Sequence, residues 1–313
     1  MAELRVRLFG EIAVIHRDRP VTFPSAKALE LFCYLLLNPD RPHTRESLSE
    51  VLWPSGQPGI AKRYLRQALW RFGAVTQGWP DGIVTIGPEV VRMASGPSWW
   101  LDVRAAENTY LRTRDTPAHQ LSHAQAEDLD AAVDLYRGEL MACWYHDWCI
   151  EERVRQERIH LAMLEQLIGF CMTRRLHSRG IDYGQQVLHH DPARESTHRL
   201  LIRLHHGTGD RTSALRQYER CADALAAEYG IAPSAETAAL HEQVRSGRTV
   251  DPPQAARPTG GADNLHARLD RLQADLGALR AAVEERLGPL HSPMLVGPRQ
   301  SVPRRRFDVD DAS

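Results

Sequence analysis

The stretch from residue 59 to residue 73, GIAKRYLRQALWRFG, constrains the fold of this chain more than any other. When its residues are placed on a helix at about 100° per residue, apolar and polar side chains separate onto two faces. One face holds Ala61, Leu65, Ala68, Leu69 and Phe72. The other face holds Arg63, Arg66, Gln67 and Trp70. The pattern predicts a helix that packs against a core on one side and leaves a basic side free.

The charges around this helix have a single sign. No Asp or Glu occurs between residues 54 and 80, whereas that segment holds the cations Lys62, Arg63, Arg66 and Arg71. Such a local field suits a polyanion, although an ordinary solvated basic helix would have the same composition. The whole chain has a formal net charge of −1, so a nucleic-acid role depends on local segregation of charge. Residues 1–97 carry 12 Lys and Arg against 9 Asp and Glu, while residues 98–249 carry 18 against 22.

The segments on either side of the basic helix favour a nucleic-acid role. Alternating apolar residues predict strands over residues 4–8, 12–15 and 21–23. Ser25 and Thr44 are N-cap residues before two further helices, the first of which ends near Asn38. Apolar runs at residues 83–86 and 90–93 flank Gly87-Pro88-Glu89, which predicts a hairpin. This order is that of a winged helix-turn-helix, with residues 59–73 as the major-groove helix and the hairpin as the wing.

A different pattern follows the break at Gly96-Pro97. From Trp99 onward the sequence predicts a wholly helical region, with helices over residues 126–140, 150–176, 180–190, 195–206, 211–229 and 234–245. Pairs of these helices have about the length of a tetratricopeptide unit, which indicates degenerate helical repeats. Leu residues at heptad spacing predict one more helix near the C-terminus, which either pairs two subunits or folds onto its own chain.

The predicted fold is therefore mainly α with a small β component, a winged helix-turn-helix followed by a tetratricopeptide-like all-helical domain. The expected divisions are 1–97 for the winged helix, which should fold by itself, 98–248 for the helical domain, 249–261 for a linker, 262–288 for the heptad-patterned helix and 289–313 for a disordered tail.

Signals for catalysis or metal binding are weak. The chain contains no phosphate-binding loop motif, no Gly-x-Ser-x-Gly and no His-Glu-x-x-His, so we expect neither an enzyme nor a cofactor. The histidines at 189, 190, 198, 205 and 206 lack a complete ligand set, and residues 144–148, WYHDW, fit packing between helices better than a ligand pocket. Five cysteines without paired spacing, no signal peptide and no apolar run of spanning length predict a cytoplasmic protein.

Two sets of motifs resemble a known family. The segments LRVRLFGEIAV, FPSAKALELFCYLLLNPDRPHTRESLSEVLWP and LRQALWRF resemble the OmpR-like DNA-binding domain of the Streptomyces antibiotic regulatory proteins. The segments YRGEL, DW, ER, DP, HRLL and GD, between residues 136 and 210, are similar to the bacterial transcriptional activator domain that follows it in that family. The two resemblances occur in the family's order.

The resemblance and the charge pattern together predict a sequence-specific transcriptional activator. Lys62, Arg71 and Arg92 would contact phosphates, Arg63, Arg66 and Gln67 would contact base edges, and Trp70 a sugar or a thymine methyl group. The resemblance implies binding as a homodimer to repeated promoter sites on double-stranded DNA and recruitment of RNA polymerase holoenzyme. Candidate polymerase contacts are Trp53, Pro54, Ser55 and Gln57. The alternative is a helical-repeat adaptor for a peptide or small effector, with a winged helix that no longer binds DNA.

Overall fold

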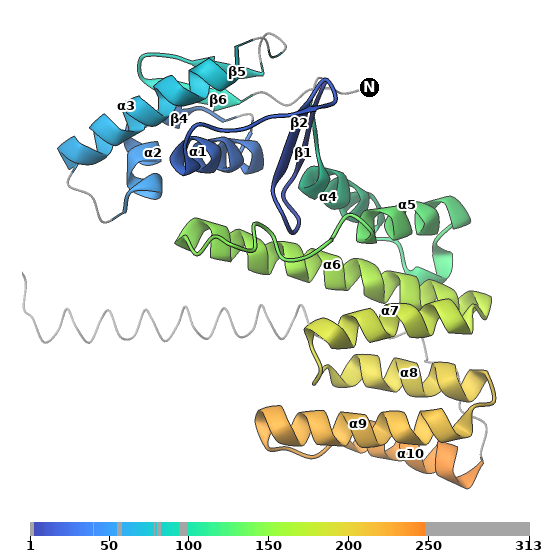
Figure 1. Ribbon diagram of the computed structural model, residues 1–313. Coiled ribbons are helices and arrows are strands. Elements are labelled where there is room, and N and C mark those ends of the chain that lie inside the picture. Colours follow the sequence, from blue (N-terminus) through green and yellow to red (C-terminus); the bar gives the residue numbers. More distant parts are fainter. Residues whose placement is uncertain are drawn as a thin grey trace, which may run out of the picture. The chain divides into compact units, whose positions relative to one another are not determined.

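A computed structural model describes residues 3–39, 41–54, 58–77, 79, 83–93 and 99–247 (Figure 1). These residues are mainly helical with two small sheets, and the fold class expected from the sequence is confirmed. The predicted linker, heptad-patterned helix and tail, residues 249–313, lie outside the described residues.

The first sheet joins the start of the chain to a segment almost a hundred residues later. Its strands are β1 (Leu4–Arg7), β2 (Ala13–His16), β3 (Arg19–Pro20) and β7 (Trp99–Leu101), in the order β3-β2-β1-β7. The strand expected at residues 21–23 is wrong, because Arg17 and Asp18, both with positive φ, turn the chain earlier and the third strand is Arg19–Pro20. The expectation of a wholly helical chain from Trp99 is also wrong, since β7 pairs in parallel with β1.

Three helices follow the first hairpin and carry the predicted caps. They are α1 (Ala26–Leu37), α2 (Arg45–Leu52) and α3 (Pro58–Val75). The Ser25 hydroxyl accepts a hydrogen bond from the Ala28 N–H at 3.2 Å, and the Thr44 hydroxyl accepts one from the Ser47 N–H at 3.1 Å. Each cap satisfies one of the N–H groups that the first turn of a helix leaves without a partner, so both helix starts are as predicted.

The second sheet forms the wing. Strands β5 (Val84–Ile86) and β6 (Val90–Met93) make the expected hairpin, and the two-residue strand β4 (His43–Thr44) pairs with the other edge of β6. The sequence did not predict β4, because two residues are too few to show a period. Since β4 runs directly into α2, it ties the wing to the helix-turn-helix.

The rest of the described chain is a row of helices. After α4 (Asp102–Thr113), a short 3-10 turn (Ala118–Gln120) and α5 (His123–Val133), the chain continues through α6 (Asp147–Arg174), α7 (His177–His190), α8 (Glu195–Gly207), α9 (Arg211–Tyr229) and α10 (Ala235–Ser246). Helices α6 to α10 pack each against the next (Figure 1). The helix expected at residues 126–140 is wrong at its C-terminal end, because α5 stops at Val133 and Leu140 instead forms a β-bridge with Phe9.

Contacts between the first sheet and the helical region are buried and polar as well as apolar. The Asp102 carboxylate accepts hydrogen bonds from the N–H groups of Leu8 at 2.9 Å and Phe9 at 3.1 Å. The Met141 N–H donates to the Leu8 carbonyl at 2.9 Å. A single cluster of contacting buried apolar side chains includes residues of both regions, from Leu4 in β1 to Leu204 in α8. The division after residue 97 stays a prediction, and these contacts cross it.

Within residues 144–148, Trp148 packs against α1 while Tyr145 is 78% exposed, so packing between helices accounts for part of this segment. The ring of Trp148 meets that of Tyr34 edge-on at a centroid distance of 5.3 Å. Arg153 holds the preceding loop in place, because its guanidinium donates to the carbonyls of Leu140, Met141 and Trp144 at 2.8–3.0 Å. The loop between α5 and α6 is therefore bound both to α6 and to the winged helix.

Candidate nucleic-acid interface

The buried side of α3 is the one expected from the sequence. Ala61, Leu65, Ala68, Leu69 and Phe72 are all buried, and the Phe72 ring lies 5.7 Å from that of Phe32 in α1. An apolar stripe at helical spacing fixes how the helix is rotated about its own axis. The rotation of α3 therefore determines which of its side chains face outward.

The outward side of α3 carries the residues expected to read base edges. Arg63, Arg66, Gln67 and Trp70 are all exposed, and 75% of the surface of Trp70 is accessible. An indole this exposed adds little to the core. Packing alone therefore does not explain why a tryptophan occurs at this position of the helix. The exposure of these four residues agrees with the sequence-based expectation, while their contacts with DNA stay predictions.

Lys62 has an acidic neighbour that the linear sequence hides. Its Nζ lies 3.0 Å from the Glu46 carboxylate of α2, and both side chains are more than half exposed. Although residues 54–80 contain no acid, folding places one beside the first cation of the helix. An exposed ion pair of this kind is weak, and a phosphate can replace the carboxylate as the partner of Lys62. While the pair is formed, Lys62 adds less to the local positive potential than the neighbouring arginines do.

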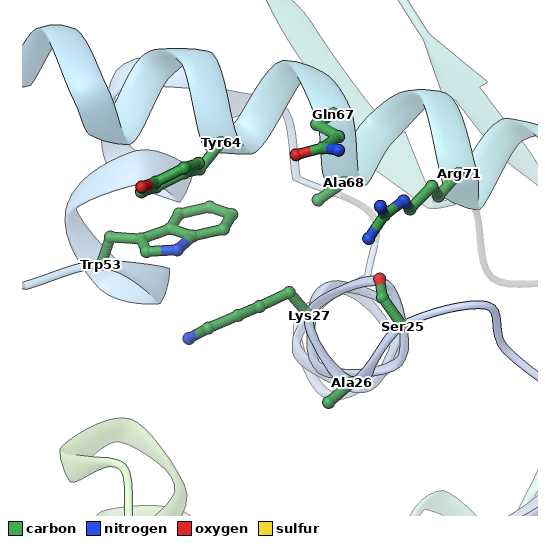
Figure 2. Close-up of a pocket in the computed structure, with 8 residues that line it drawn as sticks. All are labelled: Ser25, Ala26, Lys27, Trp53, Tyr64, Gln67, Ala68 and Arg71. Atoms are coloured by element: carbon green, nitrogen blue, oxygen red, sulfur yellow. The ribbon is translucent and has the colours of Figure 1, made fainter.

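Arg71 belongs to a groove on the flank of α3 that shares Gln67 with the outward face. The groove has a volume of about 280 Å³ (Figure 2) and is lined by Ser25, Ala26, Lys27, Trp53, Tyr64, Gln67, Ala68 and Arg71. In Figure 2, Gln67 and Arg71 project from α3 toward the start of α1. Sequence reasoning missed Lys27 and Tyr64 as neighbours of this helix face, because no local period links residues 27, 53 and 64.

The turn after α2 contributes one wall of that groove. Trp53 is half-buried, and its ring lies 6.2 Å from the ring of Tyr64 and 5.2 Å from the Lys27 ammonium nitrogen. Of the other residues proposed to contact polymerase, Pro54 is exposed. Ser55 and Gln57 lie outside the described residues.

The wing presents Arg92 on its exposed side. Arg92 lies between the buried Val91 and Met93 on β6, which places its side chain on the opposite face of the strand. The Arg45 guanidinium donates to the Gly87 carbonyl at 2.9 Å, and the Arg45 N–H donates to the Glu89 carbonyl at 3.0 Å. Arg45 therefore holds the tip of the wing against the start of α2.

Two histidines of the helical region, His160 and His198, are buried within the fold. The ring of His160 stacks on Tyr136 at 4.1 Å, and burial, reinforced by His190, lowers the pKa of His160 to about 4. His198 contacts the Pro192 carbonyl and the Gln217 amide, each at 2.8 Å. Among the residues that the structure describes, no group of three or more His, Cys, Asp or Glu is placed to hold a metal ion. Within the same residues, no helix is long and apolar enough to cross a membrane.

Comparison with known proteins identifies the helical region. Residues 101–245 match the bacterial transcriptional activator domain. None of the proteins with curated descriptions matches the sequence. A solved structure of EmbR from Mycobacterium tuberculosis, in complex with a low affinity phosphopeptide, is similar in fold with a TM-score of 0.67. The two chains share 19% sequence identity, and the similarity covers 80% of this chain and 67% of the EmbR chain.

The chain has a winged helix-turn-helix fold followed by a bacterial transcriptional activator domain. Residues 101–245, just under half of the chain, belong to the bacterial transcriptional activator domain family. The domain match and the similarity in fold agree with the two resemblances to the Streptomyces antibiotic regulatory proteins in the sequence.

Proposed function

We propose that the chain binds specific promoter sequences on double-stranded DNA through α3 and recruits RNA polymerase holoenzyme there. The observation that carries this proposal is the outward side of α3, where Arg63, Arg66, Gln67 and Trp70 are exposed together on a helix whose rotation is fixed by its buried side. The major groove of B-DNA is wide enough to admit an α-helix such as α3.

The exposed side chains have distinct roles in this proposal. Arg63 and Arg66 contact base edges, preferably guanine, while Gln67 suits adenine. Arg92 on the wing and Arg71 on the flank of α3 contact phosphates, which set the register of the protein on the duplex without reading sequence. Lys62 joins them once DNA displaces it from Glu46.

The turn after α2 and the helical region supply the activating functions. Trp53 and Pro54 are the described candidates for contact with the polymerase holoenzyme, and two copies of the chain bind adjacent repeats as a homodimer on DNA. Linking two weak binding events in this way raises the affinity of each. The protein acts in the cytoplasm, where both DNA and polymerase are available.

The test is DNA binding by single substitutions in α3. Arg63→Ala and Arg66→Ala should each weaken binding to a selected cognate duplex by about 1–3 kcal/mol and reduce discrimination among sequences, since each removes a base contact. Fluorescence anisotropy on duplexes with one or two sites measures both affinity and the benefit of repeats.

Arg158→Ala is the matched control, because Arg158 is also an exposed arginine but lies on α6 in the helical region. If both α3 variants bind cognate DNA as tightly as the control, α3 does not read DNA. That result would favour the adaptor function.

A further inference from the structure

Glu30 in α1 is a buried carboxylate shared by two parts of the molecule. Only 3% of its surface is accessible. Its Oε2 lies 2.8 Å from the Lys27 Nζ, and its Oε1 lies 3.3 Å from the His146 Nε2, which belongs to the loop before α6. A buried charge is costly unless partners surround it, and Oε1 accepts no hydrogen bond within the described chain, so the His146 ring beside it and the ion pair with Lys27 both matter to the position of the carboxylate.

Lys27 continues this chain of contacts to the end of α2. Its Nζ donates to the Leu52 carbonyl at 2.6 Å, in the last turn of that helix, and lies over the Trp53 ring. A cation at the C-terminal end of a helix satisfies a free carbonyl and interacts favourably with the helix dipole. Figure 2 shows Lys27 extending beside Trp53, whose ring faces Tyr64 of α3.

We propose that Glu30 is a positioning residue through which His146 of the helical region holds Lys27 against the end of α2. The path runs from His146 to Glu30, from Glu30 to Lys27, and from Lys27 to the Leu52 carbonyl and the Trp53 ring. It fixes the wall of the groove that flanks α3. Its importance for DNA rests on the proposed function, but the coupling itself does not.

The geometry distinguishes this path from an ordinary surface ion pair. The Glu30 side chain is 4% exposed, so the carboxylate cannot replace a lost partner with bulk water without opening the junction. Oε1 accepts no hydrogen bond from the described residues, and loss of His146 removes the polar ring that lies 3.3 Å from it. The carboxylate then turns or admits water, and its contact with Lys27 loosens.

Hydrogen exchange on the full chain without DNA tests the coupling. His146→Gln should speed exchange of the Leu52 and Trp53 amides about fivefold, because the end of α2 opens more often. Amides in the middle of α1, such as that of Phe32, should be unchanged, which separates local opening from global unfolding. Asp128→Asn, which removes the exposed partner of Arg112, is the control and should change neither set.

The decisive measurement repeats His146→Gln in a Lys27→Met background. If the path is real, Lys27→Met already releases the end of α2, and His146→Gln adds no further increase in exchange there. An equal increase in both backgrounds would overturn the proposal, as would no increase in either. His146 is partly exposed, so His146→Gln should fold even where a Glu30 variant does not.

DNA affinity of the same variants separates this inference from the proposed function. Weaker cognate binding by His146→Gln would show that the groove wall supports α3 on DNA. If the unaltered chain bound no DNA, the proposed function would fail, while the exchange result would still decide the coupling.

Discussion

The Asp102 carboxylate provides the sharpest test of how the two regions are joined. It begins α4, is 2% exposed, and accepts hydrogen bonds from the N–H groups of Leu8, Phe9 and Val103 at 2.8–3.1 Å. Asp102→Ala leaves the N–H groups of Leu8 and Phe9 without an acceptor in a region where Leu8 is fully buried. At about 1–3 kcal/mol for each buried N–H left unpaired, the unfolding free energy should fall by about 2–6 kcal/mol.

Urea unfolding followed by circular dichroism measures this loss. Asp115→Ala is the control, because its side chain is 88% exposed and contacts only Arg114 among the ion pairs of the described chain, so it should change the unfolding free energy by less than about 0.5 kcal/mol. If Asp102→Ala were as mild as Asp115→Ala, the carboxylate would not hold the first sheet to the helical region, and the reasoning about the junction would be refuted.

Two further predictions concern the pH dependence of stability and the extent of the N-terminal folding unit. The folded-state pKa of His160, about 4, lies below its ordinary value of 6.5, so the stability it contributes is present above pH 6.5 and is lost as pH falls toward 4. The loss is about 3 kcal/mol, and His160→Phe, which keeps a ring against Tyr136, should remove that part of the acid sensitivity in urea titrations. An unchanged acid dependence would mean that another group is responsible. The sequence predicts that residues 1–97 fold alone, but β7 and Asp102 lie beyond that boundary. A fragment of residues 1–97 should therefore melt at a lower temperature than a fragment of residues 1–115. Equal melting temperatures would show that β7 is dispensable.

Local sequence patterns predicted the parts of the fold that depend on neighbouring residues. The five buried positions of α3 follow from helical spacing alone, and Ser25 and Thr44 cap helices because their hydroxyls reach backbone N–H groups three residues away. The wing hairpin could also be predicted from the sequence, since a single turn joins its two strands. Such features need no knowledge of the rest of the chain.

Most of the features that sequence reasoning missed depend on distant contacts. The segment Trp99–Leu101 is too short to show the alternation of a strand, and it forms a strand because it pairs with β1. Lys62 gains an acidic neighbour from α2, and the groove beside α3 combines residues 27, 53 and 64. No pattern within a window of a few residues contains these pairings, so the candidate site could be predicted as a helix face but not as a three-dimensional surface.

Helix α1 is the element through which the helical region meets the proposed recognition helix. Phe32 packs against Phe72 of α3, and Tyr34, two residues later, packs against Trp148 of α6. Glu30 lies on the same helix one turn before Tyr34 and joins His146 to Lys27. Because aromatic and ionic contacts of both regions lie within five residues of one helix, a displacement of the loop before α6 must shift either α1 or its contacts. Residues 30–34 of α1 therefore contact both the helical region and α3.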